Sequence, residues 1–196
     1  MISSVNLSGV TKFFEQMPTI AAKAASLAIN EVANKSGLAL MRKDIESQIA
    51  FPNGYLNSAD KLGVTKSASP TSLQAIITAK DRPTSLARFA TSRNPEINRG
   101  NPIKVQVKRG KRVQLKKAFL VRLKNGNVGL AVRLRPGETL KNKMQAATVK
   151  LGPNVYLLYA PSVEQVFQNV AKARIPELSN QLSNQFFRQF ARLSRG

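Results

Sequence analysis

The chain of 196 residues contains no cysteine, no histidine and no tryptophan. Without cysteine, disulfides, zinc–thiolate sites and thiol catalysis are excluded. Without histidine, the chain lacks the commonest general base and the commonest transition-metal ligand. We therefore expect no metal, no cofactor and no small-molecule substrate.

Long apolar runs are also missing. No run approaches the length needed to span a bilayer, and the amino-terminal "MISSVNLSG" lacks the charged start and apolar stretch of a signal peptide. The expected amphipathic helices do not concentrate Lys and Arg beside Trp or Phe, which argues against a basic peripheral membrane protein. The sequence predicts a soluble protein that acts in the cytoplasm where it is made, with no membrane partner.

Acidic residues are scarce, with 10 against 31 Lys and Arg, and the net charge is +21. Residues 81–150 hold 18 basic and 3 acidic residues, a net charge of +15, whereas the other 126 residues contribute +6. A charge of this size favours polyanions, acidic proteins or anionic membrane surfaces. The acidic residues are too scattered to indicate a metal cage or a catalytic pair, so we do not expect an enzyme.

Helical periodicity marks both ends of the chain. Residues 18–50 are rich in Ala, Leu and Lys, and their apolar positions recur at helical spacing, which predicts one long helix. Near the other end, Ser162 and Gln165 form a capping box, and Pro176 is expected to open a separate final helix. The apolar stripe of that final helix comprises Ile175, Leu178, Leu182, Phe186, Phe190 and Leu193.

The middle of the chain alternates apolar and polar side chains, which predicts antiparallel strands. Residues 103–107 and 113–115 read as two strands joined by the turn "RGKR", and Asn125-Gly126 predicts a tight hairpin turn between two more. Residues 80–102, which carry three prolines, are expected to form a long exposed loop. The apolar side of the strands is predicted to bury Val107, Val113, Leu115, Phe119, Val121 and Leu123.

These patterns together predict an α+β fold. A central antiparallel β region, with hairpins around residues 103–134, is flanked by a long N-terminal helix and amphipathic C-terminal helices. We expect a single domain over residues 1–196, made of a helical arm (1–50), a basic β region (51–160) and C-terminal helices (161–196). Two arrangements are open for the end helices: they close the chain's own core, or one of them faces a neighbouring subunit.

Lysine and arginine fill the predicted strand face opposite the apolar side chains. One interpretation is a surface that lies along phosphates. The alternative is a solvated face that keeps a β segment soluble and discourages edge pairing. Stacking aromatics and DNA-reading modules are not visible, so we do not expect sequence-specific recognition. The predicted channel-facing or DNA-facing basic surface comprises Lys104, Lys108, Arg109, Lys111, Arg112, Lys116, Lys117, Arg122, Lys124, Arg133 and Arg135.

Two segments of the sequence, together with the order of the predicted elements, resemble a known protein family. An Ala-rich helix is followed by "KKAFLVRLKNGNVGLAVR" (116–133), then by "VYLLYAPSVEQVFQN" (155–169) and an amphipathic final helix. In this order the chain resembles the phage minor tail protein Z family, the tail-completion proteins of long-tailed phages. The resemblance covers nearly the whole chain, although its most specific parts are short: Ala118-Phe119 before "LKNG", and Leu158-Tyr159 before Pro161-Ser162-Val163.

The resemblance implies a structural virion protein without catalysis, which acts late in tail assembly as a ring at the head-proximal end of the tail and helps head–tail joining. It implies tail and neck proteins as partners, self-association for which we expect a hexamer, and a place in the virion after assembly in the host cytoplasm. In such a ring the basic face would either line the channel of the genome and contact DNA without sequence specificity, or meet an acidic neighbouring protein. The competing prediction is a non-specific nucleic-acid-binding accessory protein. The expected subunit contact comprises Tyr159, Pro161, Val163, Phe167, Phe186 and Phe190.

Overall fold

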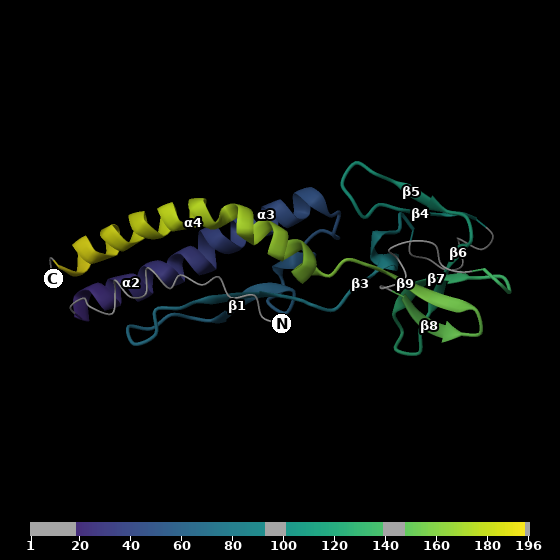
Figure 1. The fold of residues 1–196 in the computed structure, drawn as a ribbon, viewed down its shortest axis with the longest axis horizontal. Helices are drawn as coiled ribbons and strands as arrows, with labels where there is room; N and C mark the ends of the chain where they lie inside the picture. Colours follow the sequence, from purple (N-terminus) through teal and green to yellow (C-terminus); the bar gives the residue numbers. More distant parts are fainter. Residues whose placement is uncertain (1–18, 93–100, 139–147, 195–196) are drawn as a thin grey trace. The chain divides into compact units, whose positions relative to one another are not determined.

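The computed structural model describes residues 19–92, 101–138 and 148–194. Internal contacts divide the chain into two compact units, whereas the sequence predicts a single domain. Unit 1 consists of residues 1–45, 56–81 and 164–196, and unit 2 of residues 46–55 and 82–163. Unit 1 is mostly helical and unit 2 mostly antiparallel strands, so the predicted α+β class is confirmed (Figure 1).

The helix predicted over residues 18–50 is present only in part as an α-helix. α2 (Thr19–Glu31) and α3 (Leu38–Gln48) are separated by a π-helical segment, η1 (Val32–Gly37). Within η1, the Asn34 amide and the Ser36 hydroxyl donate to backbone carbonyls one turn earlier, which competes with the α-helical hydrogen-bond ladder. Glycine at position 37 adds a weak helix former.

A short antiparallel ribbon belongs to unit 1 as well. It pairs β1 (Leu62–Lys66) with β2 (Ile76–Ala79). Asn30 of α2 fastens the chain beyond β1, because its amide donates to the Ala68 carbonyl at 2.9 Å and accepts from the Ala68 N–H at 2.7 Å. The predicted β region 51–160 is therefore divided between the two units.

The prediction of a separate final helix that begins at Pro176 is wrong. α4 runs from Val163 to Leu193 with Pro176 inside it, and Ser162 lies directly before its start. Proline removes one N–H donor and crowds the preceding turn, which bends a helix without always ending it. Figure 1 shows α4 changing direction along its length.

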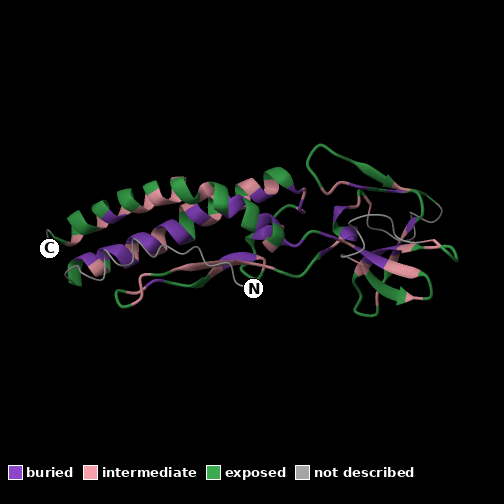
Figure 2. Cartoon of the chain, in the orientation of Figure 1, coloured by how far each residue is buried: buried purple, intermediate pink, exposed green. Residues whose placement is uncertain are grey.

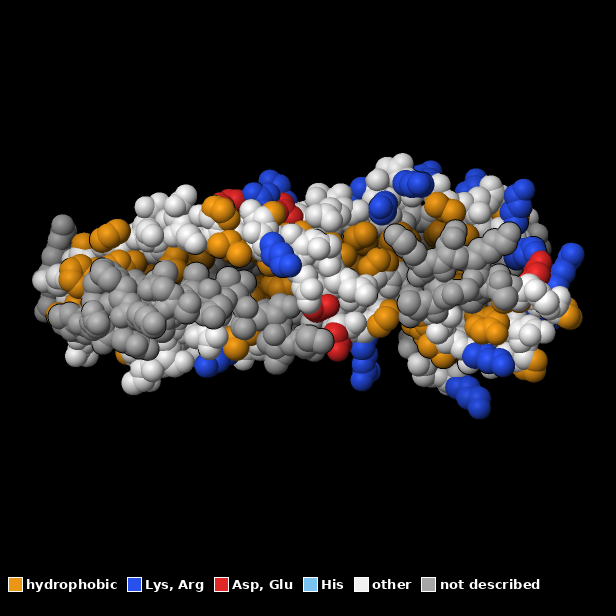
Figure 3. Space-filling view, viewed as in Figure 1, with side chains coloured by type: hydrophobic (Ala, Val, Ile, Leu, Met, Phe, Trp, Pro, Cys, Tyr) orange, Lys and Arg blue, Asp and Glu red, His pale blue; other side chains and the backbone are white. Residues whose placement is uncertain are grey.

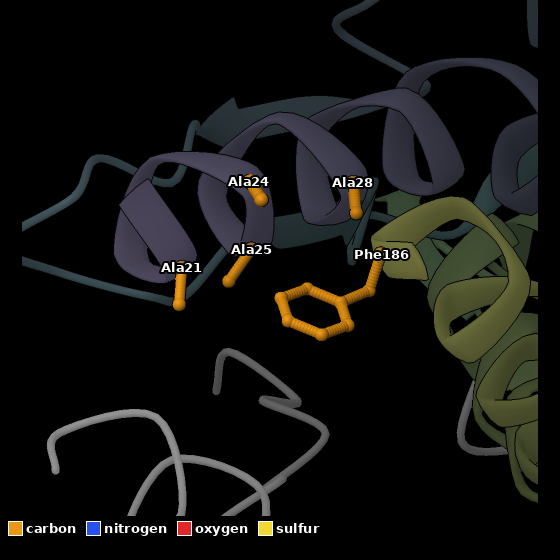
Figure 4. Close-up of a cluster of buried hydrophobic side chains, with 5 residues drawn as sticks. All are labelled: Ala21, Ala24, Ala25, Ala28 and Phe186. Atoms are coloured by element: carbon orange, nitrogen blue, oxygen red, sulfur yellow. The ribbon is translucent and has the colours of Figure 1, made fainter. Parts of the chain in front are cut away.

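Helices α2 and α4 pack against each other through small residues and one aromatic ring. The Phe186 ring lies against Ala21, Ala24, Ala25 and Ala28 (Figure 4), and buried residues follow one another along α2 (Figure 2). Leu73, Leu182 and Leu193 pack around this cluster. The predicted stripe of α4 is buried only in part, since Ile175 and Phe190 are 39% and 38% exposed.

An ion-pair cluster joins α3 to α4. The Arg174 guanidinium donates from Nε and Nη2 to the two oxygens of Asp44, at 2.5 and 2.9 Å. Its Nη1 donates to Glu177 at 2.7 Å. These hydrogen bonds hold the pKa of Asp44 below its ordinary value and raise the pKa of Arg174.

Unit 2 is built on an antiparallel sheet in the order β3-β9-β7-β6, with β8 also paired to β9. Its strands are β3 (Thr84–Ser85), β6 (Ala118–Arg122), β7 (Val128–Arg133), β8 (Thr148–Gly152) and β9 (Val155–Ala160). A separate two-stranded ribbon pairs β4 (Ile103–Val105) with β5 (Val113–Leu115), as predicted. Leu130 and Ala131, which lie on opposite faces of β7, are both fully buried, so the sheet is covered on both faces there.

The predicted hairpin between β6 and β7 is present with its turn at Asn125-Gly126, but its buried side differs from the prediction. The Leu123 N–H donates to Asn127 O and the Gly126 N–H to Leu123 O. Of the turn residues only Gly126 has a positive φ, 79°, so this is a three-residue turn and not the two-residue type. Leu120 is buried while Phe119 and Val121 are half-buried, because apolar side chains occupy both faces of the sheet.

Part of the predicted exposed loop 80–102 is buried. A short 3₁₀ helix, η3 (Leu86–Phe89), follows β3 and lies against β7 and β9. Its Leu86 and Phe89 are 3% and 5% exposed. Residues 93–100 of the predicted loop lie outside the described residues.

Candidate functional site

The two units differ sharply in charge. Unit 2 holds 18 Lys or Arg and 3 acidic residues, a net charge of +15, and unit 1 holds 13 and 7, a net charge of +6. Figure 3 shows Lys and Arg side chains spread over the surface of unit 2. The basic middle of the sequence therefore coincides closely with one compact unit.

The β4–β5 hairpin (residues 103–115) carries the densest part of this charge. Its register pairs Lys104 with Gln114 and Val105 with Val113. Ile103 and Val105 are buried, whereas Val113 is 44% exposed, so the prediction that Val113 is buried is wrong. The reason is that β4 is covered by the chain segment at residues 89–91, through the Gln106 to Phe89 and Thr91 to Lys104 hydrogen bonds, and β5 forms the outer strand.

The hairpin is fastened to the end of α3. The Ala50 N–H donates to Val107 O at 2.7 Å, and Ile49 forms an antiparallel bridge with Lys108. Arg109 supplies two further bonds: its backbone N–H donates to Gln48 O at 3.2 Å, and its Nε donates to Glu46 O at 2.7 Å. The last carbonyls of a helix have no partner within the helix and carry partial negative charge, which a guanidinium satisfies.

An aromatic cluster lies in the segment that follows α3. Phe51 stacks on Tyr55 with ring centroids 5.2 Å apart and meets Phe89 of η3 at 5.5 Å. The Arg88 guanidinium lies 5.4 Å from the centre of the Tyr55 ring. The hairpin is thus attached to a packed part of unit 2.

The eleven residues of the predicted basic surface are all exposed, but three of them have structural partners. Arg109 caps α3, Lys117 pairs with Glu138 at 2.6 Å, and Arg112 Nε lies 3.4 Å from Gln106 Oε1. The Arg135 N–H and Lys117 together lower the pKa of Glu138. Within the described part of the chain, no side-chain hydrogen bond or ion pair is made by Lys104, Lys108, Lys111, Lys116, Arg122, Lys124, Arg133 and Arg135.

The predicted subunit-contact residues do not form one accessible surface. Val163, Phe167 and Phe186 are buried in the chain's own core at 0%, 4% and 8% exposure, because α4 packs inward there. Pro161 is exposed and Tyr159 is half-buried. Phe190 remains accessible at 38%. Of the two arrangements open for the end helices, the buried side chains Val163, Phe167 and Phe186 therefore follow the one in which α4 closes the chain's own core.

Several exposed side chains were not identified from the sequence. Phe187 is 66% exposed beside the buried Phe186, and Val149 and Leu151 of β8 are 53% and 47% exposed. The pair of adjacent phenylalanines indicates that one of them is exposed, because neighbouring residues on a helix point about 100° apart and cannot both face one partner. Lys150, between the two exposed β8 residues, adds a further exposed cation.

In residues 19–92, 101–138 and 148–194, none of the helices combines the length and the hydrophobicity of a membrane span, and no three Asp or Glu side chains gather as metal ligands would. Compared with known proteins, the chain matches no family model, no curated protein and no solved structure.

Proposed function

We propose that the chain is a structural virion protein of a tailed phage, a tail-completion or connector component at the head-proximal end of the tail that helps head–tail joining. The observation that carries the proposal is the separation of charge, +15 in unit 2 against +6 in unit 1. A protein placed around the path of a genome needs one surface that attracts phosphates and other surfaces for protein contacts. The resemblance of residues 116–133 and 155–169 to the minor tail protein Z family supports the same proposal.

In this proposal the chain assembles with further copies of itself and with other tail and neck proteins. We expect a ring of six copies, found in the virion and assembled in the host cytoplasm. We assign the subunit contact to side chains of unit 1 that the chain's own core leaves accessible, namely Phe187 and Phe190. Exposed aromatic side chains of this kind are typical anchors of protein interfaces.

Electron microscopy of purified particles tests the proposal. We expect density for the chain at the head-proximal end of the tail, and we expect particles made without it to accumulate as separate heads and tails. Purified, infectious virions that lack the chain would overturn the proposal. Light scattering of the isolated protein reports whether the ring forms without the tail.

A second candidate is a nucleic-acid-binding accessory protein without sequence specificity. The exposed cations of unit 2 that have no partner among the described residues favour it. Tight binding to random DNA that persists at physiological salt, together with absence from the particle, would select this function. Binding that is already lost at physiological salt, by a protein that is present in the particle, would select the tail function.

A further inference from the structure

We propose that the β4–β5 hairpin and the adjoining Lys116 bind the phosphates of duplex DNA, through the cations Lys104, Lys108, Lys111, Arg112 and Lys116. The proposal rests on the proposed function, which places the cations of unit 2 beside DNA. It goes further by assigning the DNA contact to one element of that unit. Arg109 is not part of this set, since its guanidinium caps α3.

The hairpin presents its charge without internal compensation. Residues 97–137 contain no acidic side chain, and Glu138, which follows them, is already paired with Lys117. Lys104, Lys108, Lys111 and Lys116 make no ion pair with the rest of the described chain. Their mutual repulsion destabilises the unit, and an external polyanion removes that repulsion.

The hairpin is also held in place before any ligand binds. Bonds from Ala50 to Val107 and from Arg109 to Glu46 and Gln48 fix its tip to the end of α3. At a rise of at most about 3.3 Å per residue in an extended chain, the segment from Lys104 in β4 to Lys108 in the loop spreads its charge over up to roughly 13 Å. Duplex DNA carries one charge per about 1.7 Å of axis, so several phosphates lie within that reach. Because the hairpin is ordered in advance, binding costs little backbone entropy.

The side chains favour nucleic acid over an acidic protein. On the hairpin and its flanks, residues 104–117, the exposed positions carry Lys, Arg, Gln or Gly, with Val113 as the exposed apolar side chain. Protein interfaces centre on apolar and aromatic anchors and have few charged residues in their core. In contacts with DNA, half or more of the hydrogen bonds go to phosphate and sugar, and Lys and Arg supply many of them.

The side chains also favour a duplex over a single strand. Binding to single strands without sequence preference depends on aromatic rings that stack on bases. Residues 101–117 contain no aromatic residue. Contacts to phosphates alone are insensitive to base sequence, so we expect equal affinity for duplexes of different sequence.

The test measures the salt dependence of binding to a 30-base-pair duplex of random sequence by fluorescence anisotropy. The triple variant Lys108→Gln, Lys111→Gln, Arg112→Gln removes three charges at the tip. The matched control Lys23→Gln, Lys43→Gln, Lys172→Gln removes three exposed charges from unit 1. Each phosphate contact contributes about 0.9 to the slope of log affinity against log salt, so the tip variant should lower that slope by about 2 to 3. The control should leave it nearly unchanged.

Three outcomes overturn the proposal. The first is an equal slope for the tip variant and the control, with circular dichroism showing both folded. The second is wild-type binding to polyglutamate of matched charge that is as tight as binding to DNA and equally weakened in the tip variant, which would assign the surface to an acidic protein. The third is tighter binding to a single strand than to the duplex. A second variant, Lys104→Gln with Lys116→Gln, guards against a local effect of the tip substitutions and should lower the slope by about 1 to 2.

The result is separable from that of the particle experiment. Presence in the virion with an unchanged slope in the tip variant leaves the tail function standing and rejects only the hairpin. Absence from the virion with a lowered slope supports the hairpin and rejects the tail function.

Discussion

Unit 1 and unit 2 use charge in opposite ways. Of the six ion pairs among the described residues, five lie in unit 1 and one lies in unit 2. In unit 1, Arg174 of α4 bonds Asp44 of α3, and Lys61 and Ser58 both bond Asp60 and lower its pKa to about 2. In unit 2 most cations point outward without a partner in the described chain. The same residue types therefore support one unit and leave the other dependent on its core for stability.

The largest expected effect concerns the packing of unit 1. Phe186→Ala should lower the free energy of unfolding by about 3 to 5 kcal/mol, because it leaves a cavity against the alanine face of α2. Urea unfolding measures the loss, and hydrogen exchange should show it mainly in unit 1. The adjacent Phe187→Ala removes a ring that is 66% exposed and should change stability by less than about 0.5 kcal/mol. Equal losses for the two variants would contradict the α2–α4 packing.

The next effect concerns the sheet of unit 2. A Cβ added at Gly129 would lie 2.8 Å from Leu157 Cδ2, so Gly129→Ala should cost about 1 to 3 kcal/mol through overpacking. Gly152→Ala is the matched control, because nothing lies within 4 Å of its added Cβ. Thermal unfolding of the two variants compares them. A Gly129→Ala variant as stable as the wild type would show that the Leu157 side chain yields and that the packing there is not tight.

The third prediction concerns the ion pair between Asp44 and Arg174 in unit 1 and how its contribution to stability depends on pH. Asp44→Asn should lower the free energy of unfolding by about 1 to 2 kcal/mol at neutral pH, since it loses charge-assisted bonds to Arg174. The folded pKa of Asp44 is lowered below its ordinary value of 3.8, so its contribution is present above that value and is lost as the pH falls through the folded pKa. Chemical unfolding at several pH values should show the variant and the wild type converging in acid. A difference that persists undiminished at pH 2 would show that the effect is not ionic.

The smallest prediction concerns Arg109, the cation of unit 2 that caps α3. Arg109→Ala should destabilise unit 2 by about 1 kcal/mol, because the Glu46 carbonyl at the end of α3 loses its donor. Lys111→Ala, two residues away, removes a side chain that has no partner in the described chain and should stay within about 0.5 kcal/mol of the wild type. Urea unfolding with hydrogen exchange at the hairpin separates the two. Equal losses of stability in the two variants would show that the Arg109 side chain does not stabilise the end of α3.

Local periodicity is enough to predict the α+β class and the β4–β5 and β6–β7 hairpins. It is not enough where tertiary contacts decide. Pro176 stays inside α4. The sequence alternation also does not tell which residues of β6 are buried, because both faces of its sheet carry apolar residues. The basic surface was visible as composition, but the role of Arg109 depends on a contact across 63 positions of the chain. No spacing rule reports such a contact.

The π-helical segment η1 has a consequence for insertions and deletions in this chain. A π turn closes a bond over five residues where an α turn closes it over four, so η1 sets the angular phase between α2 and α3. Deleting one residue from Val32–Gly37 would let an unbroken α-helix form with α3 in nearly the same angular phase, because the wide turn already accommodates one extra residue. Met41 and Ile45 would keep facing the interior, where they are 2% and 0% exposed. A second deletion would remove a residue from a regular α-helix and turn α3 by about 100°. We therefore expect this segment to tolerate the loss of one residue but not of two.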